Sequence, residues 1–236
     1  MELGVASGAN AFRLFEILSP QKMYLIDPWR IFSWDWVQKN NDFTDELIEL
    51  YKEVLKSWDP DGDSNNPDKT FEYLYQKIIE YFRPHEHVQI IRGFSQDVVD
   101  QIPDHSIDIL YVDGNHTEIE VFKDLATYNI KISSDGIIMG NDFLRSNSPT
   151  LQHYGVIEGV LKFCHQYPEW HLFAINKNQY ADFILSKDTR FDETLISKLK
   201  NDGVEVETFN QDALGAFLKD AEEIDFSHQT PGEFVE

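Results

Sequence analysis

Acidic and amide side chains stand directly after two apolar segments of this sequence. Asp113 follows the apolar run 107–112, and the pair Asn141-Asp142 follows the run 136–139. If these runs are neighbouring parallel strands, their carboxyl ends lie at one edge of the sheet, and the three side chains can converge on one ion. Oxygen ligands of this kind suit Mg²⁺, Mn²⁺ or Ca²⁺. The spacing therefore predicts a metal site.

A histidine lies three residues after Asp113. Histidine titrates near neutral pH, so His116 is suited to removing the proton of a substrate hydroxyl. The plain alternative is a loop histidine that caps a helix beginning at Thr117. Because acidic side chains converge beside it, we interpret His116, with Asp113, as catalytic: a base or a contact to the substrate.

The first apolar run ends in a glycine-bearing turn. "ELGVASG" places Glu2, Gly4 and Gly8 where glycines let a ligand approach the backbone and the next helix offers free N–H groups. Asp27 ends the next apolar run, about twenty residues further on, where a carboxylate can hold both hydroxyls of a ribose. Ala6 stands where the dinucleotide motif needs a glycine, so a nucleoside site is favoured over a nicotinamide cofactor.

A third turn carries polar groups suited to the edge of an adenine. "RGFSQDV" contains Gly93 followed by Ser95 and Gln96. Ser95 is also a good helix N-cap, and both roles are compatible.

The elements that must position these side chains alternate along the chain. Buried parallel strands are predicted at 1–5, 23–26, 88–91, 107–112 and 136–139. Helical patterns lie between or after them, at 9–18, 117–130 and 154–167. This order predicts an α/β protein with a doubly wound, Rossmann-like, mostly parallel sheet. "WHLFAIN" and "YADFILSK" predict an antiparallel hairpin at which the sheet ends.

Residues from about 30 to 85 form too long a segment for an ordinary crossover. They contain two amphipathic helical patterns, so we predict an inserted helical cap after the second strand. Trp29, Trp34 and Trp36 either stack on a ligand or pack this cap on the sheet. The remaining residues, 189–236, form a C-terminal extension with an acidic tail and no recognisable chemistry.

Charge and composition exclude several classes of partner. The net charge of 20 − 42 = −22, without a local basic patch, argues against nucleic acid and anionic membranes. No segment approaches the roughly 20 apolar residues of a membrane helix, and no targeting signal is visible. The single Cys164 excludes an internal disulfide and fits a buried helix position. We expect a cytoplasmic protein.

Five segments together resemble class I S-adenosylmethionine-dependent methyltransferases: "MELGVASGANAF", "LIDPW", "RGFSQDVV", "YVDGNH" and "GIIMGNDF". The likeness covers residues 1 to about 186 and is closest to cation-dependent O-methyltransferases of the catechol type and the macrocin (sugar) type. It implies a methyltransferase domain at 1–188 and S-adenosyl-L-methionine as the cofactor. It also implies the roles of the turn residues: Glu2, Gly4 and Gly8 line the methionine part, Asn10 contacts its carboxylate, Asp27 takes the ribose, Ser95 and Gln96 face the adenine, and Gly93 and Asp113 complete the site.

The resemblance also implies Mg²⁺ at the acidic cluster. In the resembling enzymes an acid and an Asp-Asn pair hold the ion, whereas here the pair is reversed. Asp113 and Asp142 are therefore the stronger candidate ligands, and Asn141 is the weaker. Catechol-type enzymes carry a lysine base at the position of His116. The implied reaction is methyl transfer to a hydroxyl of a small polar metabolite, sugar-like or glycosylated.

Two other functions stay open: an NAD-dependent oxidoreductase and a non-catalytic nucleoside-binding protein. The first motif begins at Glu2, directly after the first residue, whereas the resembling enzymes have further residues before it. We expect that the natural polypeptide begins further upstream; the alternatives are that the inserted helices, or a neighbouring subunit of a homodimer, cover the gap.

Overall fold

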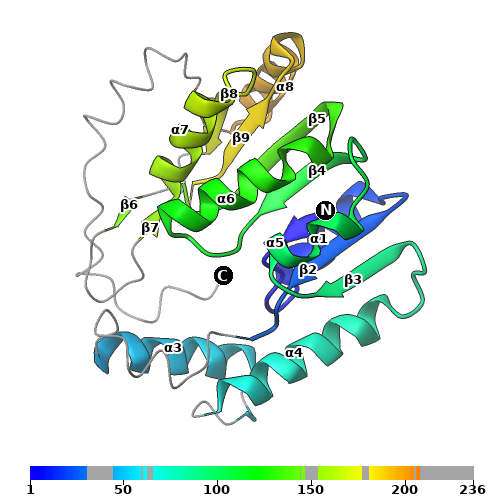
Figure 1. The fold of residues 1–236 in the computed structure, drawn as a ribbon, viewed down its shortest axis with the longest axis vertical. Helices are drawn as coiled ribbons and strands as arrows, with labels where there is room; N and C mark the ends of the chain where they lie inside the picture. Colours follow the sequence, from blue (N-terminus) through cyan, green and yellow to red (C-terminus); the bar gives the residue numbers. More distant parts are fainter. Residues whose placement is uncertain are drawn as a thin grey trace.

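The computed structural model describes residues 1–30, 45–59, 61–62, 66–143, 145–146, 154–176, 181–204 and 206–207. Its centre is an eight-stranded sheet in the order β10-β8-β9-β5-β4-β1-β2-β3 (Figure 1). The parallel part contains β1 (Glu2–Leu3), β2 (Met23–Asp27), β3 (Val88–Arg92), β4 (Ile107–Val112) and β5 (Ile132–Gly140). This is the doubly wound, Rossmann-like α/β fold that the sequence predicted.

Alternation of side chains along the strands divides the core between the two faces of the sheet. In β2, Tyr24 and Ile26 belong to the largest buried cluster, whereas Met23 and Leu25 belong to a second cluster on the opposite face. A strand with side chains buried on both faces reads as a continuous apolar run, which is why "MYLI" was recognisable.

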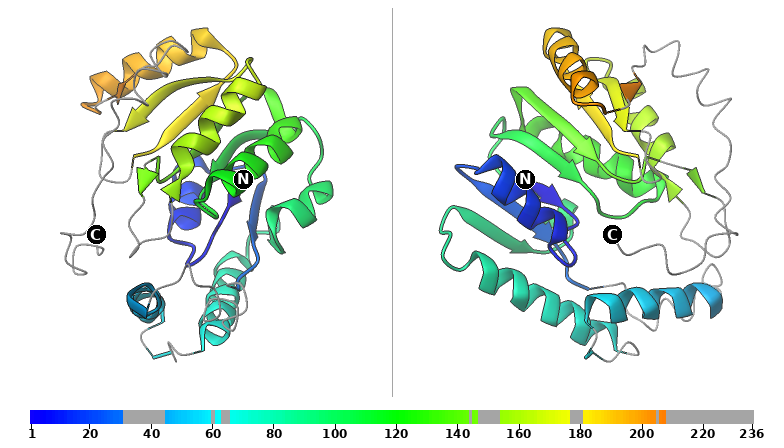
Figure 2. Two further views of the ribbon diagram at one scale, coloured as in Figure 1. Left: turned by 60° about the vertical axis from the view of Figure 1, so that its left-hand side comes forward. Right: turned by 180° about the vertical axis from the view of Figure 1, so that it is seen from behind.

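Helices cover both faces of the sheet (Figure 2). The largest cluster joins the strands to α5 (Ser95–Val98), α6 (Glu118–Tyr128) and α7 (Val156–Gln166), together with the short 3₁₀ turn η1 (Val99–Gln101). A second 3₁₀ turn, η2 (Asn129–Lys131), follows α6. The opposite face is covered by α1 (Ala9–Leu18) at one end and by α8 (Thr189–Asn201) at the other. Cys164 is buried on α7, as expected.

The segment between β2 and β3 contains the two predicted helices, α3 (Asp45–Trp58) and α4 (Pro67–Phe82). α4 packs beside α1 and β2 through an apolar stripe that includes Leu74 and Ile78. α3 packs on α4, with Trp58 and Phe71 in edge-to-face contact at 6.3 Å between ring centroids. Both helices thus extend the core at the β2–β3 end of the sheet.

Antiparallel strands complete the other end of the sheet. β8 (His171–Asn176) and β9 (Phe183–Ser186) pair as the predicted hairpin, and β9 pairs antiparallel with β5. The expectation that the sheet ends there is wrong, because β10 (Val206–Glu207) pairs with β8. A separate ribbon joins β6 (Arg145–Ser146) to β7 (Tyr154–Gly155). Unlike β1, which lies in the predicted apolar run 1–5, the two-residue strands β6, β7 and β10 carry too little apolar pattern to be recognised in a sequence.

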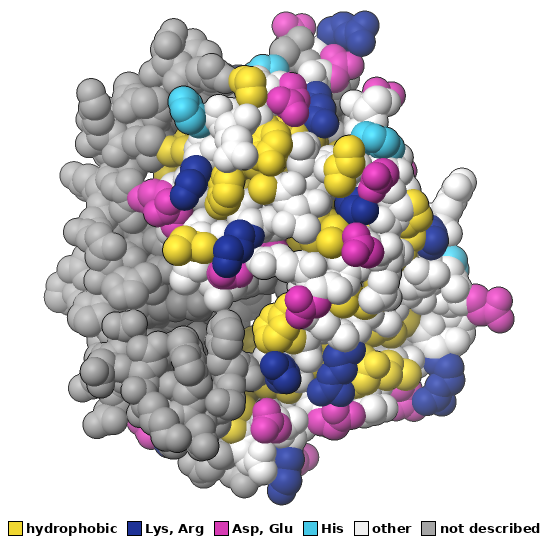
Figure 3. Space-filling view, viewed as in Figure 1, with side chains coloured by type: hydrophobic (Ala, Val, Ile, Leu, Met, Phe, Trp, Pro, Cys, Tyr) yellow, Lys and Arg dark blue, Asp and Glu magenta, His cyan; other side chains and the backbone are white. Residues whose placement is uncertain are grey.

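The surface of the described residues is mixed in charge on the face drawn in Figure 3, where Lys and Arg side chains are scattered among acidic ones. Among the described residues, no helix combines the length and the apolar character needed to cross a membrane.

Candidate active site

Five carboxylates follow one another along the carboxyl edge of the parallel strands. The order β9-β5-β4-β1-β2 brings together side chains that lie on these strands or within two residues of their ends at this edge: Asp182, Asp142, Asp113, Glu2 and Asp27. Burial is the main cause that raises the pKa of Glu2 and of Asp142, and neighbouring charges add to it: those of Asp113 and Asp27 for Glu2, and those of Asp113 and Asp182 for Asp142. This edge is therefore suited to a cationic ligand.

The predicted metal residues Asp113 and Asp142 meet at the middle of this row. Together with His116 they offer ligand atoms that all lie within 4.8 Å of one another. Nε2 of His116 lies 3.4 Å from Oδ1 of Asp113 and 3.1 Å from Oδ2 of Asp142. β4 and β5 are paired neighbours, so the turns after them are adjacent, as the sequence argument required. The two carboxylates are oxygen donors that fit a divalent cation such as Mg²⁺ or Mn²⁺, and His116 lies beside them.

Burial and charge act in opposite directions in this cluster. Burial lowers the pKa of His116, but the hydrogen bond with Asp113 and the charges of both acids outweigh it, and the pKa is raised. For Asp142, burial raises the pKa to about 6, although the charge of His116 opposes this change. In this arrangement the imidazolium form of His116 pairs with the carboxylates.

The backbone holds Asp142 in a conformation that few residues other than glycine adopt, with φ at 54°. The turn is fixed on both sides, because Asn141 N–H donates to the carbonyl of Val112 and Phe143 N–H donates to that of Ala181. Such strain persists only where surrounding structure imposes it, and it is enriched at functional sites. Here it directs a buried carboxylate toward His116.

The amide nitrogen of Asn141 is held by a neighbouring carboxylate, and its role as the weaker metal ligand stays a prediction. Its Nδ2 donates to Oδ1 of Asp182 at 3.0 Å, and the Tyr111 hydroxyl donates to the same oxygen at 3.1 Å. Burial, followed by the charge of Asp182, raises the pKa of Tyr111, so it stays a donor. Sequence reasoning missed Asp182. Its place just before an antiparallel strand next to β5 was the available signal.

Glu2 is a buried carboxylate with an unfilled bonding capacity. Its side chain is 1% exposed; Oε1 accepts a hydrogen bond from Nδ2 of Asn10 at 3.2 Å, whereas Oε2 is buried and has no partner among the described residues. Burial raises its pKa to about 8, against the effect of the Asn10 hydrogen bond. A buried, unpaired carboxylate oxygen is costly unless a donor or a cation meets it. The predicted contact of Asn10 with a cofactor carboxylate stays a prediction.

Asp27 organises the turn after β1. Its Oδ2 accepts N–H bonds from Val5 at 2.8 Å and Ala6 at 2.9 Å, and its Oδ1 accepts from Trp29 N–H at 2.5 Å. Burial raises the pKa of Asp27, while these three bonds lower it. A carboxylate offers about four lone-pair sites, so capacity remains on Oδ1 for a ribose hydroxyl. The ribose role stays a prediction.

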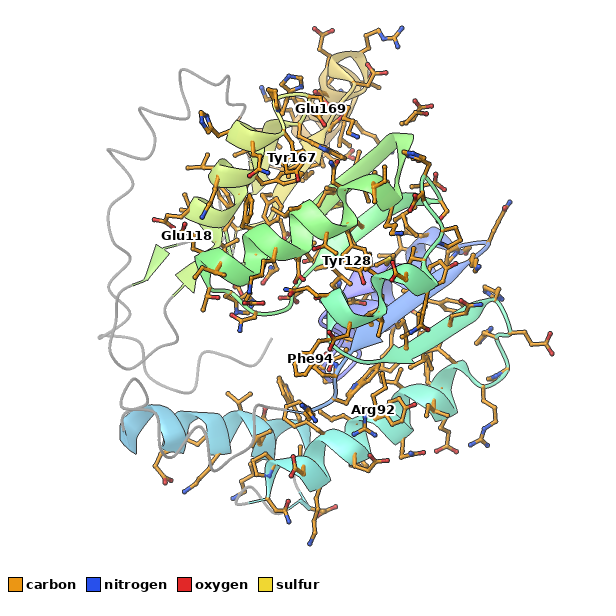
Figure 4. All side chains as sticks on the ribbon, viewed as in Figure 1. Arg92, Phe94, Glu118, Tyr128, Tyr167 and Glu169 are labelled. Carbon is orange, nitrogen blue, oxygen red and sulfur yellow. The ribbon has the colours of Figure 1, made fainter. Side chains whose placement is uncertain are left out.

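Trp29 is explained by packing. It is fully buried, its Nε1 donates to the carbonyl of Ala6 at 3.0 Å, and its ring lies 4.9 Å from that of Tyr75 on α4. Arg92, at the end of β3, reaches the same place, and Figure 4 shows it beside α4. Of the two explanations for the tryptophans, Trp29 fits packing of the insertion, and Trp34 and Trp36 lie outside the described residues.

The glycines of the turns are required by the protein itself. Gly4 has φ at 82°, and a Cβ built on it would lie 1.9 Å from the carbonyl oxygen of Asp113. Gly8 also has φ at 82° and packs against Ile78 of α4, and Gly93 packs against Val98. Their predicted place beside a cofactor is compatible with this packing and stays a prediction.

Ser95 and Gln96 lie at the start of α5, directly after β3. Ser95 is not the helix N-cap, a position that Phe94 occupies. Instead, its Oγ donates a hydrogen bond to Oδ1 of Asp124 on α6. Nε2 of Gln96 donates to Oε2 of Glu120 at 3.1 Å. Sequence reasoning placed both residues at a nucleoside but did not find Asp124.

The sheet order, the glycine turn after β1 and the acidic edge define a class I methyltransferase fold with its site at the carboxyl ends of the strands. The methyltransferase domain family model matches residues 1–143, so the chain belongs to this family and is an S-adenosylmethionine-dependent methyltransferase, as the sequence predicted. The match favours this class over the nicotinamide and non-catalytic alternatives. No curated protein matches the chain.

Several solved structures are similar to this chain, and for NovP the TM-score exceeds 0.5. The O-methyltransferase NovP is 14% identical with a TM-score of 0.51, covering 79% of this chain and 70% of its own. A SAM-dependent methyltransferase from Aquifex aeolicus is 10% identical with a TM-score of 0.47, covering 78% and 79%. Spermidine synthase from Thermotoga maritima is 11% identical with a TM-score of 0.48, covering 93% and 66%. At these identities the likeness concerns the fold alone.

Proposed function

We propose that this protein is a cation-assisted O-methyltransferase that transfers the methyl group of S-adenosylmethionine to a hydroxyl of a small polar metabolite. The observation that carries the proposal is the cluster of Asp113, His116 and Asp142. It combines two carboxylates that could bind an ion with a candidate base, all at the carboxyl edge of the parallel strands. The motif likeness to sugar O-methyltransferases supports a sugar-like or glycosylated acceptor.

The methyl donor fits the row of carboxylates. S-adenosylmethionine carries a sulfonium and an ammonium group, and the unpaired, buried Oε2 of Glu2 lies on the strand next to Asp27. A cation or N–H donor at this oxygen would satisfy it and favour the ionised form of Glu2. The positive charge of the ligand would thus stabilise the ionised form of the buried Glu2 carboxylate.

In the proposed reaction, the acceptor oxygen forms a bond to the methyl carbon while the carbon–sulfur bond breaks and its electron pair stays on sulfur, which yields S-adenosylhomocysteine. His116 would accept the hydroxyl proton in its neutral form, which a cation on Asp113 and Asp142 favours by offsetting the charges that raise the pKa of His116. The two carboxylates would hold the divalent cation, which when bound supplies a Lewis acid that acidifies the hydroxyl and offsets their charge beside His116. In-line transfer then needs little beyond positioning.

The test is formation of S-adenosylhomocysteine from S-adenosylmethionine across a panel of sugars, glycosides and catechols. We expect turnover with a hydroxyl acceptor that EDTA abolishes and added Mg²⁺ or Mn²⁺ restores. Asp113→Ala should lose this turnover and keep its affinity for S-adenosylhomocysteine, because the ion serves the acceptor. Asp100→Ala, an exposed carboxylate on η1, is the matched control and should behave like the wild type.

Two results would count against the proposal. Turnover that EDTA leaves unchanged would exclude a role for the cation in the reaction. If calorimetry shows that the protein binds NAD in preference to S-adenosylhomocysteine, S-adenosylmethionine is excluded as its cofactor.

A further inference from the structure

Asp124 is a buried carboxylate on α6 that the proposed reaction does not use. Its residue is 5% exposed, and its Oδ1 accepts the hydrogen bond of the Ser95 hydroxyl. Its other oxygen lies against the turn after β4, since a Cβ built on Gly114 would be 3.5 Å from Oδ2. Asp124 therefore connects the turn after β3 with the turn that follows Asp113.

The position of Ser95 is fixed by several contacts. Gly93 N–H donates to the carbonyl of Asp27 at 3.0 Å, which places the turn after β3 beside the proposed ribose carboxylate. The Tyr128 hydroxyl of α6 donates to the backbone carbonyl of Ser95 at 2.8 Å, and Figure 4 shows Tyr128 beside α5. Backbone and side chain of Ser95 are thus both tied to α6.

These contacts determine which hydrogen-bonding groups are left for a ligand. Burial raises the pKa of Asp124 to about 6, so at neutral pH the carboxylate is ionised and can only accept. The hydroxyl hydrogen of Ser95 is committed to Asp124, and only its oxygen lone pairs remain. Glu120 accepts from one N–H of the Gln96 amide, which leaves the second N–H and the carbonyl oxygen of Gln96. Ser95 therefore presents only an acceptor, whereas Gln96 can still accept through its oxygen and donate through its second N–H.

We propose that Asp124 is a positioning residue that makes Ser95 an obligate hydrogen-bond acceptor, so that the nucleoside end of the site selects a 6-amino purine over a 6-oxo purine. The inference rests on the proposed cofactor site, in which Ser95 and Gln96 face the base. The exocyclic amine of adenine donates and satisfies these acceptors. The carbonyl of hypoxanthine at the same place is itself an acceptor, so unpaired oxygens would face one another.

The experiment compares the affinities of S-adenosylhomocysteine and its deaminated analogue, S-inosylhomocysteine, by calorimetry at neutral pH. The wild type should prefer the adenosyl compound by about tenfold or more, the scale expected when a buried acceptor loses its donor. In Asp124→Asn the preference should fall to about threefold or less, because the new amide can donate to Ser95 and free its hydroxyl hydrogen for the 6-oxo group.

Two further variants separate this role from a merely structural one. Ser95→Ala should bind S-adenosylhomocysteine more weakly and S-inosylhomocysteine about as the wild type does. Asp97→Asn makes the same chemical change on an exposed residue of α5, and its preference should equal that of the wild type. If Asp124→Asn does not fold, the loss or retention of the preference in Ser95→Ala tests the proposal.

The outcomes distinguish the inference from the function on which it rests. A wild type that binds neither compound contradicts the cofactor site. A wild type that binds both equally well, or a preference that survives in Asp124→Asn and Ser95→Ala, overturns the role of Asp124 and leaves the cofactor site standing.

Discussion

Asn141 and Asp182 are joined across the boundary between the parallel and antiparallel parts of the sheet, with Nδ2 of Asn141 donating to Oδ1 of Asp182 at 3.0 Å. β5 and β9 pair with Gly140 opposite Phe183, so the residue after one strand and the residue before the other are neighbours. Tyr111 adds a second hydrogen bond to the same oxygen. Asp182 thus anchors the turn that carries Asp142.

We predict that Asp182→Ala lowers methyl transfer by about tenfold or more, because small displacements of a catalytic group are costly. The cation concentration needed for half-maximal rate should rise, since Asp142 loses its support. Tyr111→Phe removes one of the two bonds and keeps Asn141 in place, so its effect should be smaller. Steady-state rates against Mg²⁺ concentration measure both effects, and an Asp182→Ala variant with wild-type rates would exclude the anchoring role.

The parallel sheet was predictable because its strands are buried on both faces. β4 coincides with the predicted run 107–112, and α1 with the predicted helix 9–18. β5 begins earlier than predicted, at Ile132, because the polar residues between Ser133 and Asp135 interrupt its apolar pattern. Pairing with β4 places Ile132 opposite Ile107 and resumes at Ile137 opposite Ile109, after a register shift across the polar segment, and such long-range pairing leaves no local signal.

The convergence of Asp113 and Asp142 was predictable, because both closely follow the ends of neighbouring strands, while their roles stay predictions. Contacts between elements were not predictable. Nothing in the local sequence shows that Ser95 bonds to Asp124, because the two meet only when α5 packs on α6. The same holds for Asp182, which reaches Asn141 through the pairing of β5 with β9.

A second prediction concerns the double role of Asp27. Asp27→Ala removes the acceptor of three N–H groups, those of Val5, Ala6 and Trp29, so the free energy of unfolding should fall by about 3 kcal/mol or more. Affinity for S-adenosylhomocysteine should also fall, since the turn after β1 loses the hydrogen bonds that Val5 and Ala6 donate to Asp27. Urea unfolding and calorimetry measure the two effects. A variant with unchanged stability would show that these bonds contribute little, and unchanged affinity would exclude Asp27 from the ribose site.

A third prediction follows from the raised pKa of Asp124. The pKa is about 6 in the folded protein and 3.8 in the unfolded chain, because burial outweighs the Ser95 hydrogen bond; the neighbouring charges of Glu120 and Lys123 act in opposite directions. Between these values the folded state binds more protons, so this residue's contribution to stability falls as the pH rises from about 4 to about 6 and is then constant.

The difference between wild type and Asp124→Asn isolates this contribution. As the pH rises through that window, the variant should gain stability relative to the wild type, by up to about 3 kcal/mol for a change of roughly two pKa units. Urea unfolding of both proteins between acid and neutral pH measures the difference. Parallel stability curves for the two proteins would show that burial does not perturb Asp124.

The last prediction separates the two reasons for glycine in the turn after β1. Gly4 and Gly203 have nearly the same backbone conformation, with φ at 82° and 79°, so an alanine at either position meets a similar backbone penalty of about 1 kcal/mol. They differ in their surroundings, because a Cβ at Gly4 would lie 1.9 Å from the Asp113 carbonyl oxygen, whereas one at Gly203 has nothing within 4 Å. Gly203→Ala should therefore cost only the backbone penalty and keep full affinity for S-adenosylhomocysteine. Gly4→Ala must push the turn after β1 away from the turn that carries Asp113, so it should either fail to fold or unfold at a much lower urea concentration and lose cofactor affinity. Equal urea midpoints for the two variants would mean that the close contact between these turns is not required, and that backbone conformation alone explains Gly4.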